Sequence, residues 1–183
     1  MSLGLESGQV RVVPYDSTWP HMFASEAGRL QQHFARARLP VSIEHTGSTA
    51  VPGLAAKPIL DILAGYPQGA VVASYITVLT NADYVHREEQ EIPGREFFRR
   101  GTPRAYQVHL AAIDGAFWRD HLTFRERIRA DDALRDSYAA LKLDLAASYP
   151  RDREAYIAAK EPFVNEVLAL PVDSYVKPDT RGS

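Results

Sequence analysis

The sequence lacks cysteine and long apolar runs. None of its 183 residues is cysteine, which excludes disulfide bonds, thiolate metal sites and a cysteine nucleophile. No apolar run approaches the length of a membrane span, and the first ten residues, MSLGLESGQV, lack the basic and apolar regions of a signal peptide. We therefore expect a cytoplasmic protein that makes no contact with a membrane.

The sequence also lacks an excess of positive charge. It has 21 basic and 23 acidic residues, for a net charge of -2. No global positive field recruits nucleic acid, so a nucleic-acid partner is not expected, although a local basic patch can still hold phosphate. With 45% hydrophobic and 24% charged residues, the chain has the composition of one globular domain with a substantial core.

The order of the predicted elements indicates an α+β fold. Residue periodicity predicts strands over 10–13, 41–46, 58–64, 82–86, 96–100 and 105–113, and helices over 16–38, 70–79, 116–130, 131–147 and 151–169. A mixed sheet therefore occupies the first two thirds and helices the last third. We expect a flexible N-terminus (1–9), an α/β core (10–114), a C-terminal helical bundle packed on the core (115–170) and a loose tail (171–183).

One segment, HTGSTAVPGLAAKPILDILAG, combines a Gly-Ser pair with an aspartate among apolar residues. Gly47, Ser48 and Thr49 directly follow a predicted strand. Glycine lets backbone N–H groups approach an anion closely, and the hydroxyl groups add further donors. The three residues predict either a phosphate-binding turn or a turn without a ligand.

Asp61 lies in the next predicted strand, between Leu60 and Ile62. An unpaired carboxylate among apolar neighbours is costly, so we expect Asp61 near a strand end or cleft with a partner. The partner is a cation, a set of backbone donors or a metal ion. Lys57, four residues earlier, supplies either a simple ion pair or part of a shared anion-binding and metal-binding site.

The run EHTGSTAVPGLAAKPILDILAG, with VVPYDSTWPHMF, REFFRRG, YQVHLA and HLTFRERIRADDALRDSYAALKLDLA, closely resembles the GrpB family. The resemblance covers roughly residues 10–170, and by fold that family belongs to the nucleotidyltransferase superfamily. It implies a nucleotidyltransferase-like mixed sheet with flanking helices and a C-terminal bundle. It also implies that Gly47 and Ser48 bind nucleotide phosphate and that Asp61 holds a divalent cation, Mg²⁺ or Mn²⁺.

The resemblance extends to further candidate residues. Asp61 and His109 are the implied catalytic residues, and His109 falls on a strand where a further metal ligand is expected. Phosphate contacts are expected from the following residues: Gly47, Ser48, Thr49, Lys57, Arg99, Arg100, Arg104, Lys142 and Lys160. From the residues alone, the arginines equally fit a solvated hairpin edge, and His109 fits a hydrogen-bonded histidine of a strand.

One departure from the superfamily pattern separates two functions. Its transferases carry a second acid at the alternate position of the strand, where this sequence has Leu63. A single aspartate cannot fix two metal ions about 3.5–4 Å apart, although Glu44 or Asp114 would help if the fold brought either close. We therefore expect either a metal-dependent nucleotidyltransferase acting on an unknown acceptor, or a non-catalytic nucleotide-sensing or partner-binding module. Related domains also occur fused to a dephospho-coenzyme A kinase.

Overall fold

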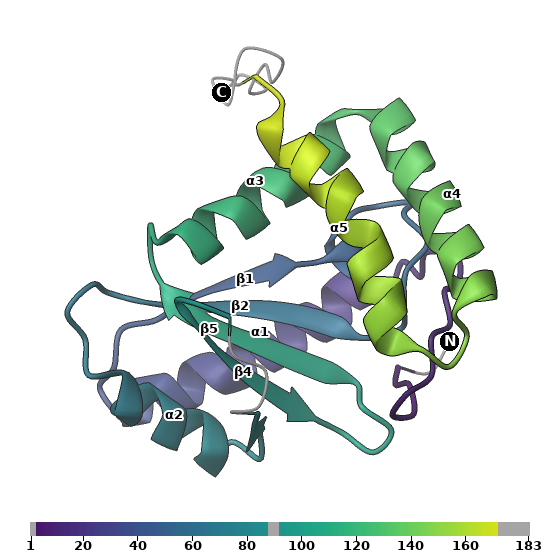
Figure 1. Ribbon diagram of the computed structural model, residues 1–183. Helices are drawn as coiled ribbons and strands as arrows, with labels where there is room; N and C mark the ends of the chain where they lie inside the picture. Colours follow the sequence, from purple (N-terminus) through teal and green to yellow (C-terminus); the bar gives the residue numbers. More distant parts are fainter. Residues whose placement is uncertain (1–2, 88–91, 172–183) are drawn as a thin grey trace, which may run out of the picture.

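The computed structural model describes residues 3–87 and 92–171 and contains one five-stranded sheet (Figure 1). Its strands are β1 (Ser42–Thr46), β2 (Leu60–Tyr66), β3 (Val85–His86), β4 (Arg95–Arg100) and β5 (Tyr106–Ala112). They lie in the order β1-β2-β5-β4-β3. The β2–β5 pair is parallel and the other pairs are antiparallel. The sheet is therefore mixed, as predicted.

Five α-helices and one 3-10 turn accompany the sheet. They are α1 (Trp19–Arg36), η1 (Ser48–Ala50), α2 (Val72–Asn81), α3 (Ala116–Ala130), α4 (Asp132–Ser148) and α5 (Arg153–Ala169). Two aspartates fix the starts of the last two helices. The Asp131 side chain accepts the Leu134 N–H at 3.0 Å, and that of Asp152 accepts the Ala155 N–H at 2.9 Å. Such N-caps satisfy donors that have no acceptor within the helix.

One face of the sheet forms the main apolar core. Ile62, Phe98 and Val108 point to this face and pack with Leu30 of α1 and Leu79 of α2, and all five side chains are fully buried. Because side chains alternate along a strand, the residues between them must point to the opposite face. Polar side chains of the strands are found on that opposite face.

The opposite face carries polar residues from three strands. The strand registers align Asp61 with Gln107, and His109 with Phe97. The C-terminal helices α3, α4 and α5 stand on this side of the sheet, whereas α1 and α2 stand on the other (Figure 1). The sheet thus separates an apolar layer from a polar space beneath the C-terminal helices.

Two sequence expectations near the N-terminus need correction. The predicted strand over residues 10–13 is wrong, since only an isolated bridge joins Val13 to Ala56. Residues 1–9 were expected to be flexible, yet Leu5 is 2% exposed and pairs with Arg104. Most of the expected tail, residues 172–183, lies outside the described residues. Across residues 3–87 and 92–171, none of the helices has the length and apolar character needed to cross a membrane.

Candidate functional site

The Gly-Ser turn lies directly against Asp61. Antiparallel pairing of β1 with β2 aligns Thr46 with Asp61, so the turn that follows Thr46 begins beside the carboxylate. Gly47 has a φ of 69°, and a Cβ atom there would lie 2.4 Å from Asp61 Oδ2. Only glycine combines this backbone conformation with such a close approach. The candidate phosphate-binding turn and the candidate metal ligand therefore share one location.

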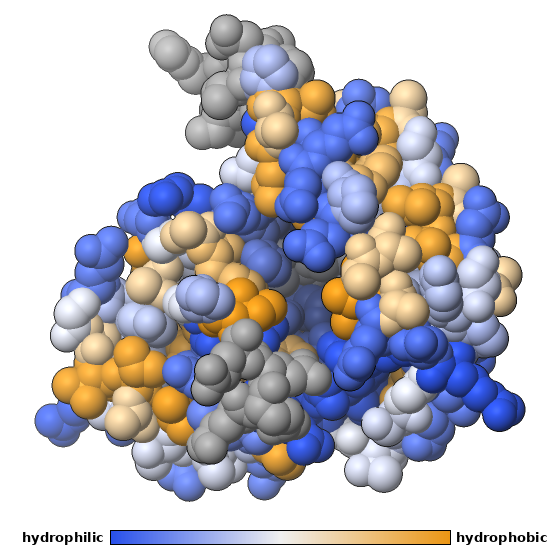
Figure 2. All heavy atoms as spheres, in the orientation of Figure 1, coloured by the Kyte–Doolittle hydropathy of each residue, from blue (hydrophilic) through white to orange (hydrophobic). Residues whose placement is uncertain are grey.

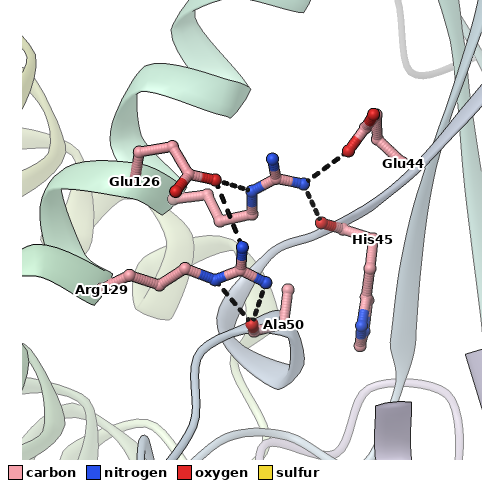
Figure 3. A network of polar contacts seen from close by, with 6 residues as sticks. Glu44, His45, Ala50, Glu126 and Arg129 are labelled. Atoms are coloured by element: carbon pink, nitrogen blue, oxygen red, sulfur yellow. Dashed lines mark hydrogen bonds and ion pairs between the residues drawn. The ribbon is translucent and has the colours of Figure 1, made fainter. Parts of the chain in front are cut away.

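Two arginines of α3 hold the turn at both ends (Figure 3). Arg125 Nη1 donates to Glu44 Oε2 at 2.9 Å and to the His45 carbonyl at 2.7 Å. Arg129 donates to the Ala50 carbonyl through Nε at 3.0 Å and Nη2 at 2.6 Å. Charge-assisted hydrogen bonds of this kind are the stronger ones in proteins. The turn is consequently fixed in shape before any ligand arrives.

His45 contacts the turn through Thr49. Its ring stacks on Phe23 with centroids 4.4 Å apart, and its Nε2 lies 3.0 Å from Thr49 Oγ1. Burial lowers the pKa of His45 to about 4, so the imidazole is neutral near pH 7 and acts as a structural support.

A cavity of about 430 Å³ opens between the polar face of the sheet and the C-terminal helices. Figure 2 shows this side of the molecule hollowed near its centre, beneath the helices. The cavity brings together the following predicted residues: Gly47, Ser48, Thr49, Lys57, Asp61, His109, Lys142 and Lys160. Sequence reasoning missed several further polar residues of the lining, namely Arg95, Gln107, Arg153 and Tyr156.

Positive charge dominates the lining of this cavity. Five basic side chains line it: Lys57, Arg95, Lys142, Arg153 and Lys160. Among the described residues, Asp61 is the only carboxylate in the lining. The whole chain contains four lysines, and the three that are described all lie here. A chain with a net charge of -2 thus concentrates cations at one site, which favours an anionic ligand.

Burial and the crowding of basic groups in the cavity lower the pKa values of two lysines. Burial, together with the charge of Lys160, lowers the pKa of Lys57 to about 7. Burial and the charges of Lys160 and Lys57 lower the pKa of Lys142 to about 6. Lys142 is 2% exposed, and its Nζ donates to the Ala55 carbonyl. A bound anion would relieve both the desolvation and the repulsion.

Asp61 is ionised despite its position. Burial acts to raise the pKa of Asp61, but contact with His109 and the charge of Lys57 outweigh it and hold the pKa below its usual value. His109 Nε2 lies 3.6 Å from Asp61 Oδ1. Its Nδ1 atom is buried and has no hydrogen-bond partner within residues 3–87 and 92–171. The two side chains therefore form a carboxylate–imidazole pair at the cavity wall.

The three arginines of the hairpin lie outside the cavity lining. Arg100 points to the opposite face of the sheet, where it pairs with Glu26 and lies 4.5 Å from the centre of the Tyr106 ring. Arg99 and Arg104 line a smaller neighbouring hollow. Strand alternation accounts for the separation of Arg99 from Arg100.

No second acid stands beside Asp61 among the described residues of the lining. Leu63, at the alternate position, is fully buried and packs with Trp118 of α3. Glu44 forms an ion pair with Arg125 at 2.9 Å, and Asp114 follows the far end of β5. Neither lines the cavity, so the fold does not meet the condition under which one of them would help Asp61.

This donor set limits any divalent cation. Within the described part of the chain, no group of three or more acidic or histidine side chains is arranged to hold a metal ion. Magnesium, however, is often bound through one or two carboxylates together with substrate phosphates. Asp61 therefore fits one divalent ion that arrives with a phosphate ligand, but it does not fit a two-metal centre.

Comparison with known proteins identifies the family. The family described as GrpB protein matches residues 9–170. This chain belongs to the GrpB family. A glutamate-rich protein GrpB of Alkalihalophilus pseudofirmus is 31% identical over 172 residues, covering 91% of this chain and 98% of that protein. A UPF0157 protein of Pseudomonas aeruginosa is 38% identical over 170 residues, covering 89% and 68% respectively. A dephospho-CoA kinase of Mycolicibacterium paratuberculosis is 29% identical over 186 residues, with 86% and 44% covered.

Solved structures place the GrpB chain among proteins with the nucleotidyltransferase fold. The crystal structure of GrpB from Enterococcus faecalis has a TM-score of 0.76 at 29% identity, covering 86% of this chain and 94% of that one. The Cid1 poly(U) polymerase with MgGTP bound has a TM-score of 0.53 at 12% identity, covering 74% and 44%. The GLD-2/RNP-8 complex has a TM-score of 0.56 at 12% identity, covering 82% of this chain and 60% of that one. At 12% identity the likeness shows the fold alone, and the predicted fold class is confirmed.

Proposed function

We propose that this GrpB-family protein binds a nucleoside triphosphate in the cavity between the sheet and the C-terminal helices. The observation that carries the proposal is the meeting of five basic side chains with the Gly-Ser turn and Asp61. A triphosphate carries several negative charges on a chain of oxygen atoms, which matches this distribution of donors. The proposal includes a cytoplasmic location, which cell fractionation tests.

Each group has a definite part in this binding. The backbone at Gly47 and Ser48 meets phosphate oxygens, as expected for a rigid glycine turn. Lys57, Lys142 and Lys160 neutralise phosphate charge. Asp61 would hold one Mg²⁺ or Mn²⁺, and the ion would supply further charge neutralisation at the phosphates.

Nucleotidyl transfer extends this proposal from binding to catalysis. A hydroxyl oxygen of the acceptor forms a bond to the α-phosphorus of the nucleotide. The bond from that phosphorus to the bridging oxygen breaks, and pyrophosphate leaves. His109, held beside Asp61 at 3.6 Å, accepts the hydroxyl proton as a general base.

One observation favours a second function of another class. Leu63 is fully buried beneath Trp118 where the superfamily places a second acid. This arrangement suits a nucleotide-sensing or partner-binding module that binds the nucleotide without turning it over. Pyrophosphate release from each nucleoside triphosphate with Mg²⁺ or Mn²⁺ distinguishes the two, because only transfer or hydrolysis produces it.

Calorimetric titration tests the binding. ATP, GTP, CTP and UTP are titrated into the protein with Mg²⁺ and, separately, with a chelator. We expect Lys57→Gln to weaken binding about tenfold in both conditions, because a basic group beside the phosphates is lost. A tenfold change corresponds to about 1.4 kcal/mol of binding free energy. Asp61→Asn should remove the gain in affinity that Mg²⁺ brings while leaving metal-free binding intact.

The exposed Arg36 at the end of α1 supplies the control. Arg36→Gln replaces a basic side chain with glutamine, as Lys57→Gln does, but outside the cavity lining, and should bind like the unmodified protein. Full nucleotide affinity in Lys57→Gln would overturn the proposed site. Full Mg²⁺ dependence in Asp61→Asn would overturn the metal role.

A further inference from the structure

A second hollow of about 320 Å³ lies beside the cavity and is rich in arginine. Four arginines line it, Arg99 of β4, Arg104 of the hairpin, Arg151 before α5 and Arg153 at the start of α5. Ser7, Gly8, Asp152 and Glu154 complete the lining. Arg153 lines both spaces, so the hollow adjoins the cavity. The other three arginines do not line the cavity.

Arg104 is the most constrained member of this arginine hollow. It is 9% exposed, and its buried Nε has no hydrogen-bond partner among the described residues. Its own backbone is fixed, because the carbonyl accepts the Leu5 N–H at 3.0 Å. The buried Nε of Arg153 likewise has no partner in the described part of the chain. A buried guanidinium donor without an acceptor is costly unless a ligand satisfies it.

The two acidic residues of the hollow offset only part of the charge of its four arginines. The Asp152 side chain already accepts the Ala155 N–H at 2.9 Å as the cap of α5. Glu154 is exposed. Burial and the nearby charge of Arg153 lower the pKa of Arg104, yet a guanidinium stays charged at neutral pH. The hollow therefore keeps a positive excess and planar donors suited to phosphate oxygens.

We propose that the arginine hollow binds a phosphate group of the second substrate, so that the acceptor is a phosphorylated molecule that also carries a hydroxyl group. This proposal rests on the proposed function, because it assigns the cavity to the nucleotide and the hollow to its partner. The lysines and the Gly-Ser turn already serve the triphosphate in the cavity. Arg153, at the boundary, contacts both ligands and sets them side by side.

Phosphorus NMR tests this with ribose 5-phosphate as the phosphorylated probe, because its signal is resolved from the three signals of ATP. The protein is first saturated with ATP and then titrated with ribose 5-phosphate. We expect ribose 5-phosphate to bind while ATP stays bound. Ribose itself, followed by proton NMR, should not bind.

Variants of the hollow identify the site. Arg151 is exposed, so Arg151→Ala should fold normally. Arg151→Ala combined with Arg99→Gln should weaken ribose 5-phosphate binding at least tenfold and leave ATP binding unchanged. The control Arg36→Ala should change neither. Unchanged binding of ribose 5-phosphate to the double variant would overturn the proposal, as would displacement of ATP by ribose 5-phosphate in the unmodified protein.

Failure of the proposed function gives a different result. If ATP does not bind at all, the nucleotide assignment fails. Binding to the hollow is then measured by the same titration without ATP. The double variant should still lose ribose 5-phosphate binding. Loss of ATP binding in Lys57→Gln with retained ribose 5-phosphate binding would support two separate sites.

Discussion

At the scale of single residues, the site depends on a glycine that touches a carboxylate. The connection between the Gly-Ser turn and Asp61 is thirteen residues or fewer in the sequence. Pairing of β1 with β2 brings the turn into contact with the carboxylate. This part of the site was predictable, because a strand, a glycine turn and a second strand form a recognisable pattern. The closeness of the contact was not, since it depends on the register of the two strands.

Substitution of Gly47 tests that contact. In Gly47→Ala the new Cβ would meet Asp61 Oδ2 at 2.4 Å and Asp61 Cβ at 3.0 Å, so we expect Asp61 to be displaced. Gly69→Ala is the matched control, because Gly69 also has a positive φ, 81°, with nothing within 4 Å of the added atom. Both variants lose about 1–2 kcal/mol to backbone strain. Only Gly47→Ala should lose more in urea unfolding and also lose nucleotide affinity.

Lys142 predicts an effect on stability. Its pKa is about 6 in the folded protein against an ordinary value of 10.5, so the unfolded chain binds the proton more tightly. The folded state therefore loses stability as the pH falls from about 10.5 to 6, and the loss is complete below that range. Lys142→Met removes this term, while loss of its hydrogen bond to the Ala55 carbonyl acts at every pH.

The measurement is the free energy of unfolding in urea at pH 10 and pH 7. Relative to the unmodified protein, Lys142→Met should gain about 1–3 kcal/mol between these two values. The variant should also bind inorganic triphosphate more weakly at pH 6. A difference in stability that is the same at both pH values would contradict the lowered pKa of Lys142.

At the scale of secondary-structure elements, α3 positions the turn that other elements supply. Arg125 and Arg129 reach backbone carbonyls of His45 and Ala50 on either side of it. The helix itself was predicted over its observed range, from its length and composition. Its arginine contacts were not, because periodicity gives the residues that share a helical face but not the element against which that face packs.

Arg129→Ala tests the role of this helix. Loss of two hydrogen bonds to the Ala50 carbonyl should cost about 1–3 kcal/mol of stability and weaken nucleotide binding several-fold, because the turn loses its fixed shape. Arg127→Ala is the control. Arg127 lies on the same helix and donates to the Val167 and Leu170 carbonyls near the end of α5.

The control should lose comparable stability in urea unfolding but keep its nucleotide affinity. Equal loss of affinity in both variants would mean that α3 acts through general stability rather than through the turn.

Strand β4 shows where sequence reasoning stopped. The cluster at residues 99–104 was predicted to supply an arginine to the phosphates, yet none of its three arginines lines the cavity, and Arg99 and Arg100 point to opposite faces of the sheet. Alternation predicts that they separate, but not which face bears the cavity. Arg153 and Tyr156 were missed for a related reason, because the sequence does not show that α5 packs over the cavity.

At the scale of the whole molecule, charge is distributed unevenly. The net charge of -2 conceals a cavity with five basic side chains and, among its described lining residues, one carboxylate. Composition correctly gave no global positive field, but it could not reveal this local one. Lysines far apart in the chain, at positions 57, 142 and 160, meet only in the folded protein.

The cavity predicts a dependence of binding on pH. The pKa values of Lys57 and Lys142 are about 7 and about 6, and a bound polyanion favours the protonated form of each. Affinity for inorganic triphosphate should therefore rise as the pH falls from 8.5 to 6, by up to about tenfold per unit for each proton taken up. The histidines His45 and His121, with pKa values lowered by burial to about 4, stay neutral over this range.

Triphosphate also takes up protons, so the unmodified protein is compared with a Lys57→Met, Lys142→Met double variant. The variant keeps the pH dependence of the ligand and lacks the contribution of the two lysines, so it should show the smaller slope. Equal slopes in the two proteins would show that the lysines take no proton on binding.

The gathering of the described lysines in one cavity also makes the protein selectively reactive. An amine with a pKa near 7, as in Lys57, is about half unprotonated at neutral pH and is a better nucleophile there than an ordinary lysine. Brief treatment with acetic anhydride at pH 7 should acetylate Lys57 faster in the folded protein than in concentrated urea, as peptide mass spectrometry would reveal. Inorganic triphosphate should protect it. Acylation would then mark the cavity by the reactivity of its lysine alone, without a bound nucleotide.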